Sequence, residues 1–176
     1  HFKSKDDILV AVTSKMTAES NRLLAAIRER TDLNGKEKLK VLFKEALVRP
    51  VQNELFSMAL DFRNNPKLLS SFLQETIENA APNYILPIIR QGISDGSIET
   101  DYPKELAELI ILVANIWTNP MIFNCSAEEA YRKFMVFGQM LKGLGLDIVD
   151  SDMVERVQEL TSIYQKTNKV RYNSAL

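Results

Sequence analysis

The residue types that most often carry enzyme chemistry are scarce in this chain. It holds one histidine, His1, and one cysteine, Cys125. A Ser–His–Asp triad, a Cys–His pair and a multi-histidine zinc site each need a histidine within the fold, and some need several. Carboxylates such as Asp61 and Glu75 are the remaining route to catalysis, and no recognisable motif surrounds them. We therefore expect a protein that is not an enzyme and that binds no metal and no cofactor.

The single cysteine and the charge balance argue against redox chemistry and against binding to DNA or membranes through net charge. No basic cluster near Cys125 activates its thiol, so we interpret this residue as a small hydrophobe rather than a redox switch. The chain has 176 residues, 45% of them hydrophobic, with 22 basic and 23 acidic residues and a net charge of −1. Bulk charge alone therefore cannot hold it to DNA or to an anionic membrane. The most apolar stretch contains an uninterrupted run only over residues 109–114, too short to span a bilayer, and a cytoplasmic location is expected.

Apolar residues recur at helical spacing along nearly the whole chain, and sustained alternation typical of strands is absent from the sequence. The pattern predicts an all-α protein of about eight helices in a single domain. Asp101 and a capping box at Ser126 are expected to begin two of these helices, while Pro82 opens one and Pro87 kinks it. The predicted helices cover residues 4–28, 36–49, 51–63, 67–79, 82–94, 103–118, 127–142 and 151–167, followed by a frayed tail at 168–176.

The opening stretch, residues 1–9, is the most specific part of the sequence. His1, Phe2, Ser4, Lys5 and Leu9 fit an "H-F-x-S-K-x-x-x-L" spacing. This stretch resembles the junction in TetR/AcrR-type transcriptional regulators between the DNA-reading helix-turn-helix and the regulatory domain. There, the serine caps a long linking helix. A looser likeness covers residues 89–93, 95–98 and 101–105, which resemble the turn between the seventh and eighth helices of the family.

The resemblance implies an all-α, TetR-type C-terminal regulatory domain that dimerises through a four-helix bundle. Residues 1–4 would be the end of the helix-turn-helix and 5–167 the ligand-binding and dimerisation domain. It further implies a cytoplasmic homodimer acting in transcription regulation, a repressor released by a small apolar or weakly polar ligand. DNA would be bound only through an N-terminal domain outside this chain, and Lys5 would neutralise a DNA phosphate unless it is merely solvated beside Asp6 and Asp7. The alternative is a helical interaction or small-molecule carrier module with no DNA role.

Aromatic and methionine side chains on the central helices are candidates for the ligand site, because such sites are mostly apolar with a few polar anchors. Asn115 is a polar anchor in the most apolar predicted helix, where a buried amide needs a hydrogen-bond partner. Ordinary core packing is the alternative for each aromatic residue. We expect a cavity between the second, third, fifth and sixth predicted helices, lined by Phe43, Met58, Phe62, Tyr84, Asn115 and Trp117.

The sixth predicted helix, residues 103–118, is apolar on more than one side, and a helix of this kind needs a partner on each. One side can face the core of its own subunit. The other is expected to meet a second subunit, together with the seventh predicted helix, unless neighbouring helices of one subunit cover it. The predicted dimer residues are Leu106, Ile110, Val113, Tyr131, Phe134, Phe137, Gly138 and Leu141.

Overall fold

The computed structural model describes residues 5–48, 62, 65–119, 122–123 and 125–174. Within this part of the chain every regular element is a helix, so the predicted all-α class is confirmed. The elements are α1 (Lys5–Arg28), α2 (Gly35–Val48), α4 (Pro66–Gln74), η1 (Glu75–Ile85), α5 (Leu86–Ser94), α6 (Pro103–Leu112), η2 (Val113–Trp117), α7 (Ala127–Gly143) and α8 (Ser151–Ser174). None of these helices is both long and apolar enough to cross a lipid bilayer.

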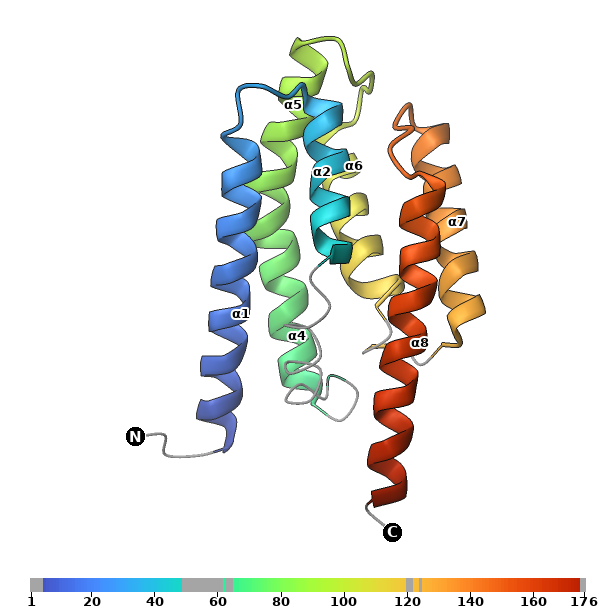
Figure 1. Ribbon diagram of the computed structural model, residues 1–176. Coiled ribbons are helices and arrows are strands. Elements are labelled where there is room, and N and C mark those ends of the chain that lie inside the picture. The colour runs from blue at the N-terminus through green and yellow to red at the C-terminus, as the bar shows by residue number, and fades with distance from the viewer. Residues whose placement is uncertain (1–4, 49–61, 63–64, 120–121, 124, 175–176) are drawn as a thin grey trace.

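The helices lie side by side as a bundle, and each long helix runs opposite to the one before it in the chain (Figure 1). α1 and the helix formed by α4, η1 and α5, which are separated in sequence by α2, therefore point the same way. α1 lies against η1, and α2 lies between α5 on one side and α8 on the other. α7 and α8 form a closely packed antiparallel pair. As a result, α1 begins and α8 ends at the same end of the bundle.

The break predicted between residues 79 and 82 does not exist. α4, η1 and α5 form one continuous helix over residues 66–94, which we call the long rod. η1 is π-helical, so the backbone N–H of Leu86 donates to the carbonyl of Ala81, five residues earlier. Pro82 lies inside η1 and Pro87 in the first turn of α5, and the wider π-helical turn carries the chain past both.

The described residues therefore form six continuous helices rather than eight. Two of the predicted helices are joined in the long rod, and the predicted helix 51–63 falls outside the described residues except for Phe62.

Several predicted helix ends are confirmed and two are wrong. Ser126 caps α7 in a reciprocal capping box with Glu129, as expected. Tyr102, not Asp101, precedes the first turn of α6, and it makes no side-chain cap. α8 continues to Ser174 instead of ending near residue 167. The sequence has no glycine or proline after residue 145, so nothing stops a helix that has begun at Ser151.

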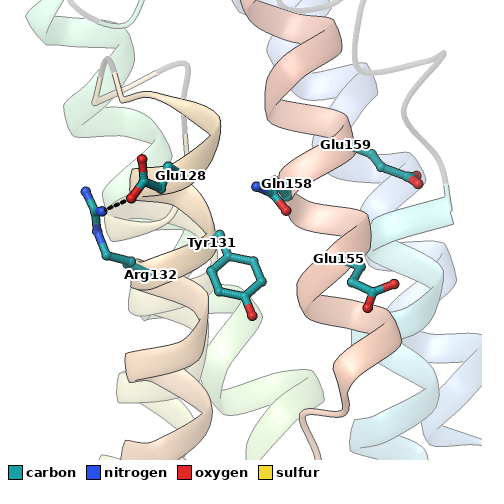
Figure 2. Close-up of a pocket in the computed structure, with 6 residues that line it drawn as sticks. All are labelled: Glu128, Tyr131, Arg132, Glu155, Gln158 and Glu159. Carbon is teal, nitrogen blue, oxygen red and sulfur yellow. Dashed lines mark hydrogen bonds and ion pairs between the residues drawn. The ribbon is translucent and has the colours of Figure 1, made fainter.

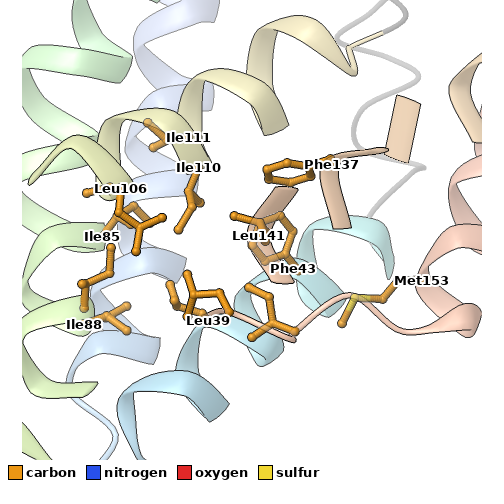
Figure 3. Packing of buried hydrophobic residues seen from close by; sticks show 14 of the residues in the cluster. Leu39, Phe43, Ile85, Ile88, Leu106, Ile110, Ile111, Phe137, Leu141 and Met153 are labelled. Carbon is orange, nitrogen blue, oxygen red and sulfur yellow. The ribbon is translucent and has the colours of Figure 1, made fainter. Parts of the chain in front are cut away.

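One large hydrophobic cluster joins α2, the long rod, α6, α7 and α8 (Figure 3). The ring of Phe43 in α2 packs against that of Phe137 in α7, with centroids 5.6 Å apart. Ile88 and Ile89 from the long rod are completely buried in the same cluster. Because helices from both ends of the chain contribute to it, the cluster holds the described helices in one bundle.

α2 and α5 approach each other most closely at two glycines. A Cβ atom added to Gly35 would lie 2.3 Å from the Cα atom of Gly92, closer than any real contact. The N–H of Gly35 donates to the Asp95 carboxylate at 2.9 Å. Hydrogen bonds from Ser97 and from this N–H hold the pKa of Asp95 below its usual range. The start of α2 is therefore fixed against the end of the long rod by both shape and hydrogen bonding.

Gly35→Ala should lower the free energy of unfolding by about 1–3 kcal/mol, because the added methyl group forces α2 away from α5. Urea denaturation followed by circular dichroism measures the change. Gly143→Ala is the matched control, since its added Cβ has no neighbour within 4 Å, and it should be neutral or slightly stabilising. Equal effects of the two substitutions would contradict the close approach.

Candidate functional site

Two of the predicted ligand residues contact the same hydrophobic cluster. Phe43 is buried within it, and Tyr84, in the π-helical segment η1, is half-buried against it. The region between α2, the long rod and α6 is occupied by Leu39, Ile85 and Ile110 from these helices. A ligand beside Phe43 and Tyr84 would thus enter among the side chains of the main core.

Phe62 lies in a different place. It is buried with Leu68 and Ile122 in a second, smaller cluster, where its ring lies 5.2 Å from that of Phe72. The structure therefore does not bring Phe62 together with Phe43 in one cluster. Met58 lies outside the described residues.

Asn115 and Trp117 lie on η2, the second π-helical segment. Asn115 is half-buried, and its backbone carbonyl accepts a hydrogen bond from the side chain of Asn119 at 3.0 Å. Trp117 is 36% exposed. The Lys133 ammonium lies 5.8 Å from the centre of its ring and donates to its backbone carbonyl at 3.1 Å. Trp117 consequently belongs to the surface rather than to an enclosed cavity.

The other side of Tyr84 is covered by α1. The guanidinium of Arg28 lies 5.7 Å above the tyrosine ring and donates to the neighbouring carbonyl of Asn83 at 2.8 Å. About two turns earlier in α1, the side chain of Asn21 donates to the carboxylate of Glu75 at 3.2 Å. Tyr84 is thus placed between the core and the last turn of α1. Sequence reasoning missed this arrangement, because no local pattern pairs residue 28 with residue 84.

Most of the predicted dimer residues are already buried inside a single chain. Ile110 is 3% exposed and Phe134 4%, and the others with comparable burial are Leu106, Phe137 and Leu141. Val113, Tyr131 and Gly138 are half-buried, and Gly138 packs against Val149 rather than against an open face. The five buried residues fill the core of their own chain and present no exposed side chain to a second subunit, and a role of the eight residues in a dimer stays a prediction.

Other apolar side chains of the same helices remain partly or largely exposed. On α6 they are the half-buried Leu109 and Leu112, whereas Ile116 of η2 packs against the second cluster. On α7 they are the exposed Met135, Val136 and Met140, with Leu144 directly after the helix. The Lys133 ammonium of α7 lies over the rings of Trp117 and Phe123. Val136, Met140 and Leu144 recur at intervals of four residues, a helical spacing from which this exposed apolar stripe can be predicted. We call this surface the outer apolar face.

Lys5 is the first residue of α1. Its side chain lies outside the description, and its contact with a DNA phosphate stays a prediction.

A shallow groove of about 650 Å³ lies between α7 and α8, away from the predicted ligand site (Figure 2). The ring of Tyr131 points from α7 into the space between the two helices, and three glutamates, a glutamine and an arginine line the rest of the groove. Two of the glutamates are paired, Glu128 with Arg132 and Glu159 with Arg156. The groove is polar and open, so its chemistry differs from that of the apolar cavity predicted from the sequence. Its lining residues are Glu128, Tyr131, Arg132, Glu155, Gln158 and Glu159.

Among the described residues, no group of three or more histidine, cysteine, aspartate or glutamate side chains is arranged to hold a metal ion. Comparisons of the chain with protein-family models, with curated proteins and with solved structures each found no match.

Cys125 is buried just before α7, and its backbone carbonyl accepts a hydrogen bond from Gln165. Burial raises the pKa of its thiol, so the reactive thiolate is disfavoured at neutral pH. Ellman's reagent should therefore modify the native protein at pH 8 at least about tenfold more slowly than the urea-unfolded chain. Since the sequence has no other cysteine, absorbance reports this site alone. Equal rates in the two states would show that the thiol is accessible and active.

Proposed function

We propose that this chain is the ligand-sensing and dimerisation domain of a TetR-like transcriptional regulator, acting as a repressor that a small apolar or weakly polar ligand releases. One observation carries the proposal most directly. The short motif at residues 1–9 places the start of a long linking helix at its serine and lysine, and α1 begins at Lys5 and continues to Arg28. A helix of this length spans about 36 Å. That reach suits an element that joins a DNA-binding head to a regulatory bundle.

The helical geometry around the predicted ligand site supports a sensing role. Tyr84 lies on η1, and Asn115 and Trp117 lie on η2. π-Helical segments are rare and occur frequently at functional sites, because they cost stability that a structural helix has no reason to lose. Two such segments in neighbouring helices thus favour a binding function for this half of the bundle.

The mechanism would be a shift between two populations. A ligand next to Phe43 and Tyr84 would favour one setting of α1 against the long rod and thereby change the spacing of the two DNA-binding heads in a dimer. The ligand can shift this balance only by its difference in affinity for the two settings. Tyr84 is suited to this role because it contacts the core on one side and Arg28 of α1 on the other.

Dimerisation would use the outer apolar face. Large exposed apolar patches on a soluble protein indicate interaction sites. A two-fold axis next to α7 would set the outer apolar face of one subunit against the same face of its partner. Four helices, α6 and α7 from each subunit, would then form a bundle around the axis.

The dimer proposal predicts that Val136→Asp combined with Met140→Asp converts a dimer into a folded monomer, because charges would enter an apolar contact. Sedimentation equilibrium measures the mass, and circular dichroism confirms that the helices remain. Ile93→Asp is the control: it places one aspartate at a comparably exposed apolar residue on α5, and the dimer should persist. A monomeric parent, or a double variant that stays dimeric, would contradict the proposed interface. Aspartate at Ile110 or Phe134 would instead disrupt the core.

The sensing proposal predicts that some members of a library of small hydrophobic compounds raise the melting temperature of the protein. At a concentration of 100 times Kd, binding stabilises the folded state by about 2.7 kcal/mol. Tyr84→Ala should abolish the shift for these compounds. Tyr131→Ala, a second half-buried tyrosine on α7, should preserve it.

The sensing proposal fails if no compound stabilises the parent, or if Tyr131→Ala rather than Tyr84→Ala abolishes binding. If a compound does stabilise the protein, a structure of the complex shows where it binds.

A further inference from the structure

Two exposed aromatic side chains meet on one ammonium group at the surface of the bundle. Trp117 ends η2 and is 36% exposed, and Phe123, in the stretch before α7, is 45% exposed. The Nζ atom of Lys133 in α7 lies over both rings, 5.8 Å from the centre of the Trp117 ring and 5.1 Å from that of Phe123. The same atom donates to the backbone carbonyl of Trp117 at 3.1 Å. Residues from three separate segments thus converge on one positive charge.

This position collects negative potential from several sources, of which the faces of the two aromatic rings are the first. Trp117 is the last residue of η2, and the last carbonyls of a helix lack helical donors and carry the negative end of its dipole. Hydrogen bonds with Ser126 hold the pKa of Glu129 below its usual range, and the charge of Lys133 also contributes. This carboxylate, one turn before Lys133 on α7, is therefore ionised at neutral pH. Ring faces, a helix end and a carboxylate all favour a cation here.

A lysine is a weak occupant of such a position. Its ammonium is compact and strongly hydrated, and it reaches the rings on a flexible four-carbon stem with much rotamer freedom. A quaternary ammonium group is hydrated less strongly, because it has no N–H to donate to water, and aromatic rings commonly bind such groups in proteins. Lys133 is only half-buried, so its ammonium can return to water when another cation takes its place.

We propose that Trp117, Phe123 and the carboxylate of Glu129 form a binding site for a quaternary ammonium ion, which Lys133 occupies in the free protein as an internal competitor. The methyl groups of the ligand lie against the two rings, and its charge replaces that of the lysine. The site is at the surface and is distinct from the core contact of Tyr84. It does not rest on the proposed function, and neither the dimer test nor the compound library measures it.

The fluorescence of Trp117, excited at a wavelength that tyrosine does not absorb, reports on this site alone, because the chain has no other tryptophan. Choline is the probe. Its uncharged isostere, in which carbon replaces the quaternary nitrogen, is the control at the same ionic strength. Choline should change the emission saturably, and Lys133→Ala should lower its Kd by about tenfold, because the competitor is removed. Lys142→Ala removes an exposed lysine of the same helix, paired with Asp147, and should leave the Kd unchanged.

Two further variants separate a cation site from a plain apolar contact. Phe123→Leu keeps an apolar side chain but removes the ring, and it should raise the Kd of choline several-fold. Glu129→Gln removes the charge while glutamine can keep the capping box with Ser126, and it should weaken binding in the same direction. A merely structural link between η2 and α7 predicts neither effect.

The proposal is overturned if choline gives no saturable change in Lys133→Ala, if the isostere binds as tightly as choline, or if Lys142→Ala strengthens binding as much as Lys133→Ala. Circular dichroism confirms that each variant is folded. Should Lys133→Ala fail to fold, Lys133→Gln replaces it, because glutamine can still donate to the carbonyl of Trp117 without a charge. An unchanged affinity for choline in that variant would equally overturn the competition.

Discussion

The contact of Gly35 with Gly92 is the constraint on which the rest of the bundle depends. It sets the distance between α2 and the long rod, because a Cβ atom added to Gly35 would lie 2.3 Å from the Cα atom of Gly92. Around it, Lys38 is 3% exposed and donates to the carbonyl of Arg28 and to the side chain of Gln91. Since a buried ammonium must have all its hydrogen bonds satisfied, the end of α1, the start of α2 and the end of the long rod can meet in few other ways.

Periodicity predicted the fold class and most helix starts, because both depend on local residue types. The capping box at Ser126 is a local signal, and it was read correctly. The joining of two predicted helices at Pro82 was not predictable by the usual rule, which treats an interior proline as a helix end. A π-helical turn relaxes that rule, and its stability comes from tertiary packing of α6 against η1, which no local sequence window contains.

Which residues of different helices pack together could not be predicted from the sequence. Periodicity showed that residues 103–118 have two apolar faces, but it could not say which face the chain would cover with its own helices. The face with Leu106 and Ile110 became core, and the face with Leu109 and Leu112 stayed half-buried, because the path of the chain places the long rod against the first of them. Phe43 and Tyr84 contact one cluster, whereas Phe62 belongs to another, since long-range pairing is fixed by the path of the chain between helices.

The shared direction of α1 and the long rod has an electrostatic consequence. Neighbouring antiparallel helices cancel each other's dipoles, but these two lie parallel, so their negative C-terminal ends point to the same end of the bundle. The buried ammonium of Lys38 lies at that end: it binds the last carbonyl of α1 and the side chain of Gln91 in the last turn of the rod. Its positive charge offsets a repulsion that dissolved ions would otherwise have to screen. This end of the molecule therefore carries a counter-ion within its own packing.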